Sequence, residues 1–201
     1  MITDLSLALA AQAAYDEPAT IAHGGVEVRV TEQAGAVIVA FRGTEFDGKD
    51  ILRDLRAVPW QDFFVGWCHS GFLKGVRGVW APLFEALEID LDKGTPIYFT
   101  GHSKGGAEAT VAAGWLAALR YPPAGLVTFG SPRCGFSRLG RVLSGVPTRR
   151  YVRGSDCVPG HPWPLWGYRH VGDAITLPGE GHRYRDHRIA GYVEAILGAS
   201  E

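Results

Sequence analysis

Gly101-His102-Ser103-Lys104-Gly105 is the stretch of this sequence best suited to covalent chemistry. It has the form G-x-S-x-G and lies between an apolar run, Ile97–Thr100, and a segment with helical spacing. A serine on a tight strand-to-helix turn projects its hydroxyl clear of both elements, and the flanking glycines let the two backbones approach closely. The spacing therefore predicts a nucleophile elbow at Ser103, although G-x-S-x-G also arises by chance in a chain with 27 glycines.

An elbow serine needs a base to take its proton, and that base is usually a histidine oriented by a carboxylate. In proteins with this elbow the chain order is serine, acid, histidine. Asp156 follows an expected strand, Thr148–Val152, and is the favoured acid; the alternative is that it caps a local turn. His187 begins an expected final helix, Asp186–Leu197, and is the favoured base, with His182 as second choice.

The tetrahedral intermediate of acyl transfer carries an oxyanion that needs hydrogen-bond donors. The backbone N–H of Lys104 is one expected donor, because an elbow aims this group at the site. Thr44 follows a buried strand, Ala36–Phe41, and offers an N–H and a hydroxyl as the other; the alternative is an ordinary β-turn. His102 is expected to face the opposite side of the elbow and to be structural.

The elements around these residues alternate between strands and helices. This predicts an α/β fold with a mostly parallel sheet covered by helices on both faces. Val26–Val30 and Ala36–Phe41 predict an antiparallel hairpin that leads into the sheet. Ligand sites in such sheets lie at the carboxyl ends of the strands. Several reactive candidates follow an expected strand end: Arg42-Gly43-Thr44, Ser103, Gly130-Ser131 and Asp156.

Three further elements are predicted from periodicity. Leu5–Ala14 has the spacing of an N-terminal helix, and Gly71–Leu87 that of a helix interrupted or kinked near Gly78 and Pro82. Tyr168–Val171 and Ala174–Leu177 are separated by Gly-Asp, which predicts a β-hairpin.

Composition describes an ordinary globular protein. The 201 residues predict a single domain over positions 1–201, and 20 basic against 21 acidic side chains indicate neither nucleic acid nor an anionic membrane surface as partner. Three cysteines without C-x-x-C spacing favour a reduced compartment. Leu5–Ala14 is apolar, but Asp4 stands where a signal peptide carries basic charge. We therefore expect a cytoplasmic protein without stable membrane insertion, with secretion as the alternative.

Ordered segments of the chain resemble one known family. They are Phe41–Thr44, Asp54-Leu55, His69–Phe72, Thr100–Ala107, Thr128–Arg133, Arg153–Asp156, Gly167–Gly172 and Asp186-His187. In this order they resemble the class 3 (fungal-type) lipases of the α/β-hydrolase superfamily. The resemblance implies the α/β-hydrolase fold and ester hydrolysis through an acyl-enzyme, without metal or cofactor. It implies Ser103, Asp156 and His187 as the triad, with Thr44 and Lys104 as oxyanion donors.

The resemblance also implies a short lid-like segment at Glu45–Trp67, with an apolar stripe at Ile51, Leu52, Leu55 and Val58. The alternative is that the stripe packs permanently on the core. Asp54 is expected to orient Thr44. Lysine at position 104 departs from the family pattern and leaves the preference for a strongly apolar substrate open.

We therefore expect a lipase or carboxylesterase acting on a small-molecule ester or lipid such as an acylglycerol, with transient contact to a lipid interface. A phospholipase or thioesterase would use the same triad. A non-catalytic α/β-hydrolase that binds a ligand is the alternative from another class, because a fold does not specify a function.

Overall fold

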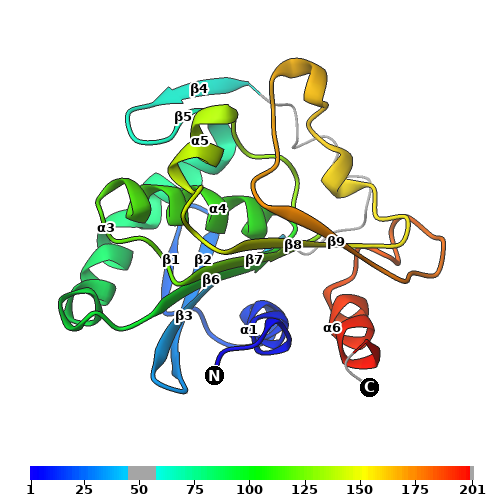
Figure 1. Ribbon diagram of the computed structural model, residues 1–201, viewed down its shortest axis with the longest axis horizontal. Helices are drawn as coiled ribbons and strands as arrows, with labels where there is room; N and C mark the ends of the chain where they lie inside the picture. Colours follow the sequence, from blue (N-terminus) through cyan, green and yellow to red (C-terminus); the bar gives the residue numbers. More distant parts are fainter. Residues whose placement is uncertain (45–57, 200–201) are drawn as a thin grey trace.

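A computed structural model describes residues 1–44 and 58–199 and has a central sheet of mixed direction (Figure 1). The strand order in this part of the chain is β1-β2-β3-β6-β7-β8-β9. The bounds are β1 Ile21–His23, β2 Val26–Gln33, β3 Ala36–Phe41, β6 Ile97–His102, β7 Gly125–Phe129, β8 Thr148–Arg153 and β9 Asp173–Leu177. Strands β1 to β3 are antiparallel, and β3, β6, β7, β8 and β9 run parallel. The predicted, mostly parallel sheet with an antiparallel entry is confirmed.

Helices cover both faces of this sheet. Figure 1 shows α3 (Ser70–Lys93), α4 (Lys104–Ala118) and α5 (Ser137–Val142) on one side, and α1 (Asp4–Asp16) and α6 (Ile189–Gly198) on the other. Strand β3 is buried along its whole length because both faces are covered. Its side chains alternate accordingly, with Val37 and Val39 in the core beneath α3 and α4 and Ile38 in the core beneath α1 and α6.

The first helix begins at a capping box. The Thr3 hydroxyl accepts a 3.1 Å hydrogen bond from the N–H of Ser6, and the Ser6 hydroxyl oxygen accepts one from the N–H of Thr3. Leu7, Ala8 and Ala11 then face the core. The predicted N-terminal helix is confirmed, and its apolar residues are core residues of the fold.

Helix α3 is not interrupted at Gly78 or Pro82, one of the two outcomes predicted, and it continues to Lys93. Proline removes one backbone donor from the helix. The side chains of Val79 and Leu83 on either side of it are fully buried, and their packing holds the helix together across that position. The helix ends at Gly94, which has a φ of 70°.

Helix α4 is buried on all sides from Gly105 to Leu116. It lies between the sheet and α3 (Figure 1). A helix in this position has no solvent-facing stripe, so its sequence shows little amphipathic periodicity. The burial extends to the carboxyl group of Glu108. Nothing in the sequence distinguishes this residue from an exposed glutamate on a helix.

The predicted hairpin of Tyr168–Val171 with Ala174–Leu177 is wrong. Residues 168–171 form no strand, and Arg169 makes only an isolated bridge to Gly135. The expected partner strand, β9, instead pairs in parallel with β8. Strands that were not predicted occur within and just beyond the expected lid-like segment, where the antiparallel pair β4 (Pro59–Asp62) and β5 (Gly66–His69) forms.

Strand β1 was not predicted. It is three residues long and joins β2 through Gly24-Gly25, a two-residue turn in which both φ angles are positive. Glycine pairs of this kind mark β-hairpins, so the turn could have revealed the strand.

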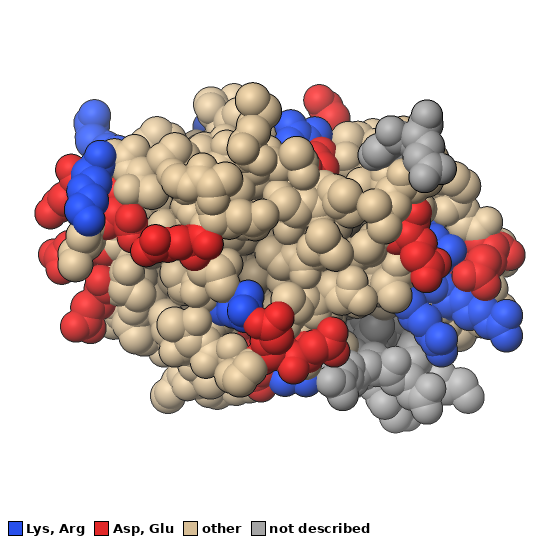
Figure 2. All heavy atoms as spheres, turned by 90° about the horizontal axis from the view of Figure 1, so that it is seen from below, with Lys and Arg blue, Asp and Glu red and all other residues tan. Residues whose placement is uncertain are grey.

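Figure 2 shows the face that carries α1 and α6, where charged side chains gather towards the two ends and in a mixed group below the centre, and the rest is largely uncharged. Acidic and basic groups are mixed on this face. Within the described ranges no helix has both the length and the apolar character needed to cross a bilayer.

Candidate active site

The elbow predicted from the sequence lies between β6 and α4. Ser103 has φ 56° and ψ −129°, a conformation that non-glycine residues rarely adopt. A hydrogen bond from its N–H to the carbonyl oxygen of Phe129 (2.9 Å) fixes the turn to β7. Backbone strain of this kind concentrates at functional sites, and here it directs the serine side chain away from both flanking elements.

The glycines of the elbow are required by the close approach of strand and helix. A Cβ at Gly101 would lie 2.6 Å from the carbonyl carbon of Gly105. A Cβ at Gly105 would overlap the carbonyl oxygen of Phe41 at the end of β3. The G-x-S-x-G spacing therefore reflects backbone packing at this turn.

Ser103, His187 and Asp156 form a continuous chain of hydrogen bonds. The Oγ of Ser103 lies 2.9 Å from Nε2 of His187, and Nδ1 of His187 lies 2.8 Å from Oδ2 of Asp156. A carboxylate only accepts hydrogen bonds, so Nδ1 carries the proton and Nε2 is free to accept from the serine hydroxyl. All three side chains are buried. The predicted acid and base are brought together with the serine from the loop after β8 and the loop before α6.

Two further donors hold the Asp156 carboxylate. The Tyr192 hydroxyl donates to Oδ2 at 2.6 Å, and the N–H of Val158 donates to Oδ1 at 2.9 Å. Burial first, and then the charge of Asp156, raise the pKa of Tyr192, so its hydroxyl remains a donor. Gly130 has a φ of 57°, and a Cβ there would lie 2.7 Å from Oδ2 of Asp156. A glycine at this position leaves the space that the carboxylate occupies.

His102 was expected to face the opposite side of the elbow and to be structural, and the first part of this prediction is wrong. Its ring centroid lies 4.6 Å from that of His187, and its Nε2 lies 2.6 Å from the His187 carbonyl oxygen. Because a carbonyl only accepts, Nε2 donates, and Nδ1 accepts from the Tyr15 hydroxyl at 2.7 Å. Burial, and then the neighbouring His187, hold the pKa of His102 well below 6.5. The residue before the serine therefore supports the backbone of the base.

The other candidate base lies outside this arrangement. His182 is exposed, and its Nδ1 accepts from the N–H of Arg185. The Nε2 atom of His170 lies 2.9 Å from the Pro159 carbonyl oxygen, and burial lowers the pKa of His170 to about 4. Of these histidines, only His187 contacts both Ser103 and Asp156.

The expected oxyanion donors lie on the residue after the serine and on the segment after β3. Lys104 is the first residue of α4, where an N–H has no acceptor within the helix. Thr44 lies three residues beyond β3, whose end pairs in parallel with the elbow strand. A Cβ at Gly43 would lie 2.6 Å from the His102 carbonyl oxygen, so the segment before Thr44 packs against the elbow.

The Lys104 side chain extends away from Ser103. Its Nζ donates to the carbonyl oxygen of Gly25 at 3.1 Å and lies 3.3 Å from Oε1 of the buried Glu108. The cation thus points towards the β1–β2 turn, and its charge is paired there. The unusual residue at this position leaves the acyl site without an added positive charge.

Part of the expected lid lies outside the described residues. This holds for Ile51, Leu52 and Leu55 of the apolar stripe and for Asp54, the expected partner of Thr44. Val58, the last member of the stripe, is exposed immediately before β4. In the described part of the chain, no group of three or more His, Cys, Asp or Glu side chains has the arrangement of a metal site.

The sheet order, the elbow and the hydrogen-bonded triad together define an α/β-hydrolase fold with a serine-hydrolase type of site. A family model described as "Lipase (class 3)" matches residues 38–165. The chain belongs to this family.

Individual relatives share the fold and part of the sequence. The secreted mono- and diacylglycerol lipase 1 of Fusarium solani is 36% identical over 126 residues, which cover 61% of this chain and 37% of that protein. The secreted mono- and diacylglycerol lipase A of Penicillium cyclopium is 28% identical over 176 residues, which cover 80% of this chain and 57% of that protein. A solved structure described as "a serine protease triad forms the catalytic centre of a triacylglycerol lipase" has a TM-score of 0.70 and 28% identity, covering 80% and 65%. The chain thus spans 37% and 57% of the length of these two curated relatives.

The names of these relatives contradict the expectation of a cytoplasmic protein, since both lipases are called secreted. The thiols of Cys68 and Cys134 are buried, and burial raises the pKa of Cys134 to about 12. Such inert thiols do not report on a redox compartment. Leu5–Ala14 packs as part of α1, so its flanking charge carries no information about export.

Proposed function

We propose that this protein is a lipase or carboxylesterase that cleaves carboxylic esters through a Ser103–His187–Asp156 triad. The observation that carries the proposal is the unbroken hydrogen-bond chain from the strained elbow serine through His187 to the buried carboxylate. Class 3 lipase membership supports the reaction class. We further propose that residues 1–201 act as one such domain, and the relatives' names support an extracellular location.

The mechanism begins with attack by Ser103 on the ester carbonyl carbon. As the bond from Oγ to this carbon forms, the hydroxyl proton moves to Nε2 of His187. Asp156 accepts the Nδ1 proton in a hydrogen bond and stabilises the resulting imidazolium. His187 then protonates the departing alcohol, which leaves an acyl-enzyme. Water then attacks the acyl carbon while its proton moves to the same nitrogen. When this intermediate collapses, the acid is released and His187 returns the proton to Oγ of Ser103.

The oxyanion of each tetrahedral intermediate would accept hydrogen bonds from the backbone N–H of Lys104 and from Thr44. The position of Lys104 at the N-terminus of α4 supports this assignment, because the helix dipole also favours negative charge there. Loss of one such donor typically lowers kcat by about 100-fold to 1000-fold.

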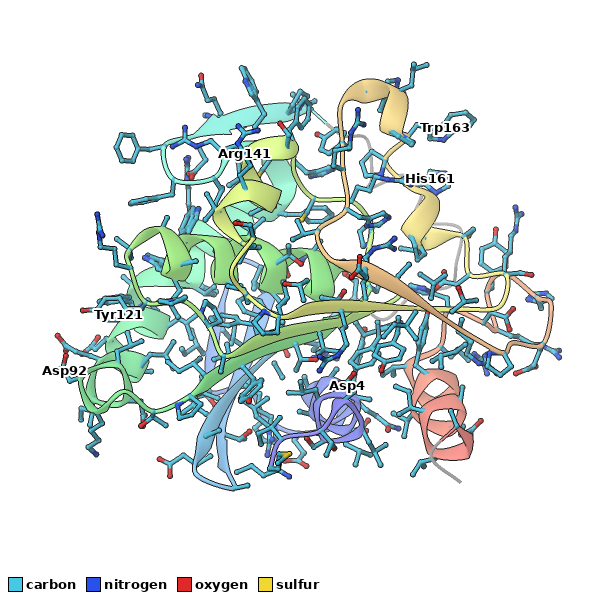
Figure 3. All side chains as sticks on the ribbon, in the orientation of Figure 1. Asp4, Asp92, Tyr121, Arg141, His161 and Trp163 are labelled. Atoms are coloured by element: carbon cyan, nitrogen blue, oxygen red, sulfur yellow. The ribbon has the colours of Figure 1, made fainter. Side chains whose placement is uncertain are left out.

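We propose acylglycerols as the substrates, as the names of the relatives suggest. A surface for transient contact with such lipids is the turn Trp163–Trp166, where Trp163 is 61% and Leu165 88% exposed. Figure 3 shows Trp163 pointing away from the body of the molecule. The β4–β5 hairpin also exposes Trp60 and Phe63. Exposed tryptophans are typical of proteins that contact a lipid interface.

The turn is held firmly in this position. Arg133 donates to the carbonyl oxygens of Gly160 and Pro162, and Arg169 donates to that of Pro164 at 2.8 Å. The loop that carries the turn begins next to Asp156. The turn is therefore connected through this loop to the acid of the triad.

The direct test is a series of p-nitrophenyl esters of rising chain length, assayed on the wild type, Ser103→Ala, His187→Ala and His182→Ala. We expect the first two variants to lose about 10⁴-fold or more in kcat and the third to keep its activity. Hydrolysis that survives in Ser103→Ala would refute the mechanism. Loss of activity in His182→Ala with survival in His187→Ala would reassign the base.

A further inference from the structure

Asp186 is a fully buried carboxylate that the mechanism above does not use. Its Oδ2 accepts a 2.8 Å hydrogen bond from the N–H of Ser155, and its Oδ1 accepts one of 2.7 Å from the N–H of Glu180. The guanidinium of Arg153 lies 3.5 Å from Oδ1. The Asp186 side chain therefore joins its own stretch of backbone to those of Ser155 and Glu180.

Two of these stretches carry members of the triad. Ser155 directly precedes Asp156, and Asp186 directly precedes His187. The Asp186 carboxylate thus links the backbone one residue before the acid to the backbone one residue before the base. The 2.8 Å hydrogen bond between Asp156 and His187 joins the two residues that directly follow Ser155 and Asp186.

The surrounding backbone is shaped to accept the carboxylate. A Cβ at Gly154 or at Gly179 would lie 2.5 Å or 2.8 Å from Oδ2 of Asp186, so only glycine leaves the required space. Gly154 has a φ of 46°. Glycine-containing loops are flexible in isolation, and the carboxylate supplies the constraint that they lack.

The charge of Asp186 is compensated within the protein. Arg153 is 7% exposed and also contacts the Glu180 carboxylate and the carbonyl oxygen of Arg185. Burial alone would raise the pKa of Asp186, but the N–H groups of Ser155 and Glu180 and the charge of Arg153 bring it below its usual value. The group is therefore ionised and accepts through both oxygens near neutral pH.

We propose that Asp186 is a positioning residue that sets the distance and orientation between the Asp156 carboxylate and the His187 imidazole. It does so by tying the acid loop to the base loop through backbone hydrogen bonds. The inference rests on the proposed function, because it assigns Asp186 a task in that triad. A misplacement of about 1 Å in a catalytic group can cost about 100-fold in rate.

The test is Asp186→Asn in the full chain. An amide keeps one acceptor oxygen, but its NH₂ group faces the second N–H donor, so one of the two loop contacts is lost. We expect kcat on a dissolved ester to fall about 10-fold to 100-fold with KM within about twofold. We also expect the downfield proton resonance of the Asp156–His187 hydrogen bond to broaden or disappear.

Asp62→Asn is the matched control. Asp62 is likewise buried and accepts from the N–H groups of Phe64 and Val65 and from Arg77, but it lies in the β4–β5 hairpin. The Asp62→Asn variant should lose comparable stability while keeping its kcat on the dissolved ester and its downfield resonance. Equal losses of kcat in both variants, or an Asp186→Asn variant with wild-type kcat and resonance, would overturn the proposal. If the wild type hydrolyses no ester, the proposed function fails, and the resonance still tests the link.

Discussion

The Nε2 atom of His102 lies 2.6 Å from the backbone carbonyl oxygen of His187. The residue before the nucleophile thus contacts the backbone of the base, while the serine contacts the imidazole ring of the base. The Tyr15 hydroxyl completes the arrangement by donating to the other ring nitrogen of His102. Helix α1, which comes first in the chain, is thereby connected to the triad.

Replacement of His102 by alanine should impair catalysis without affecting substrate affinity. The His187 carbonyl would lose its donor, and the base could then shift relative to Ser103. We expect kcat to fall about tenfold with KM within twofold. His170→Ala is the control, because His170 also contacts a backbone carbonyl but lies apart from the triad. Equal kcat values in the two variants would show that His102 does not position the base.

Gly130→Ala should nearly abolish activity. The new Cβ would lie 2.7 Å from Oδ2 of Asp156 and 3.0 Å from Nδ1 of His187, and the φ of 57° disfavours alanine. We expect a loss in kcat of about 100-fold or more. Gly140→Ala in α5 is the control, since a Cβ there meets no atom within 4 Å. Steady-state kinetics of both variants decide the prediction, and an active Gly130→Ala would contradict it.

Glu108→Gln should stabilise the protein as the pH rises. Both carboxylate oxygens of Glu108 are buried without a hydrogen bond from the described residues, although Lys104 lies 3.3 Å away. Burial raises its pKa to about 7, and Lys104 opposes that rise. The unfolded carboxyl, with a pKa of 4.5, binds fewer protons between these values, so the free energy of unfolding falls from pH 4.5 to about 7 and then levels off.

Glutamine is uncharged at every pH, so it removes the free-energy cost of ionising a buried carboxyl at this position. The variant should therefore gain on the order of 2 kcal/mol over the wild type above pH ~7, and the difference should shrink towards pH ~4. Urea denaturation across this range measures it. A difference that does not change with pH would contradict the prediction.

The double variant Trp163→Ser, Trp166→Ser should bind lipid surfaces less well. Full burial of a large apolar side chain is worth about 1.5–3 kcal/mol, and both tryptophans are already partly buried, so we expect their joint loss to weaken vesicle binding at least tenfold. The rate on emulsified acylglycerol should fall relative to the rate on a dissolved ester. Ile89→Ser removes an exposed apolar residue from α3 and serves as the control. Unchanged sedimentation with vesicles would rule out the turn as a lipid contact.

Local sequence signals predicted the parts of the fold that depend on local physics. Strand β3 was evident because burial on both faces requires an unbroken apolar run. The elbow was evident because close backbone packing excludes side chains at Gly101 and Gly105. Periodicity failed where packing overrides it. Helix α3 passes through Pro82, and β9 takes its partner from β8 instead of from the preceding residues.

The sequence by itself determined the chemistry and the order of its groups, because residue types and strand ends are local properties: a serine at an elbow, then an acid, then a histidine. Only the tertiary structure decided which groups hold them. The contacts of His102 with His187, of Tyr192 with Asp156 and of Asp186 with Ser155 join positions 31 to 85 residues apart. Hydrogen bonds over such separations depend on how the loops meet after folding, and no spacing rule along the chain encodes them.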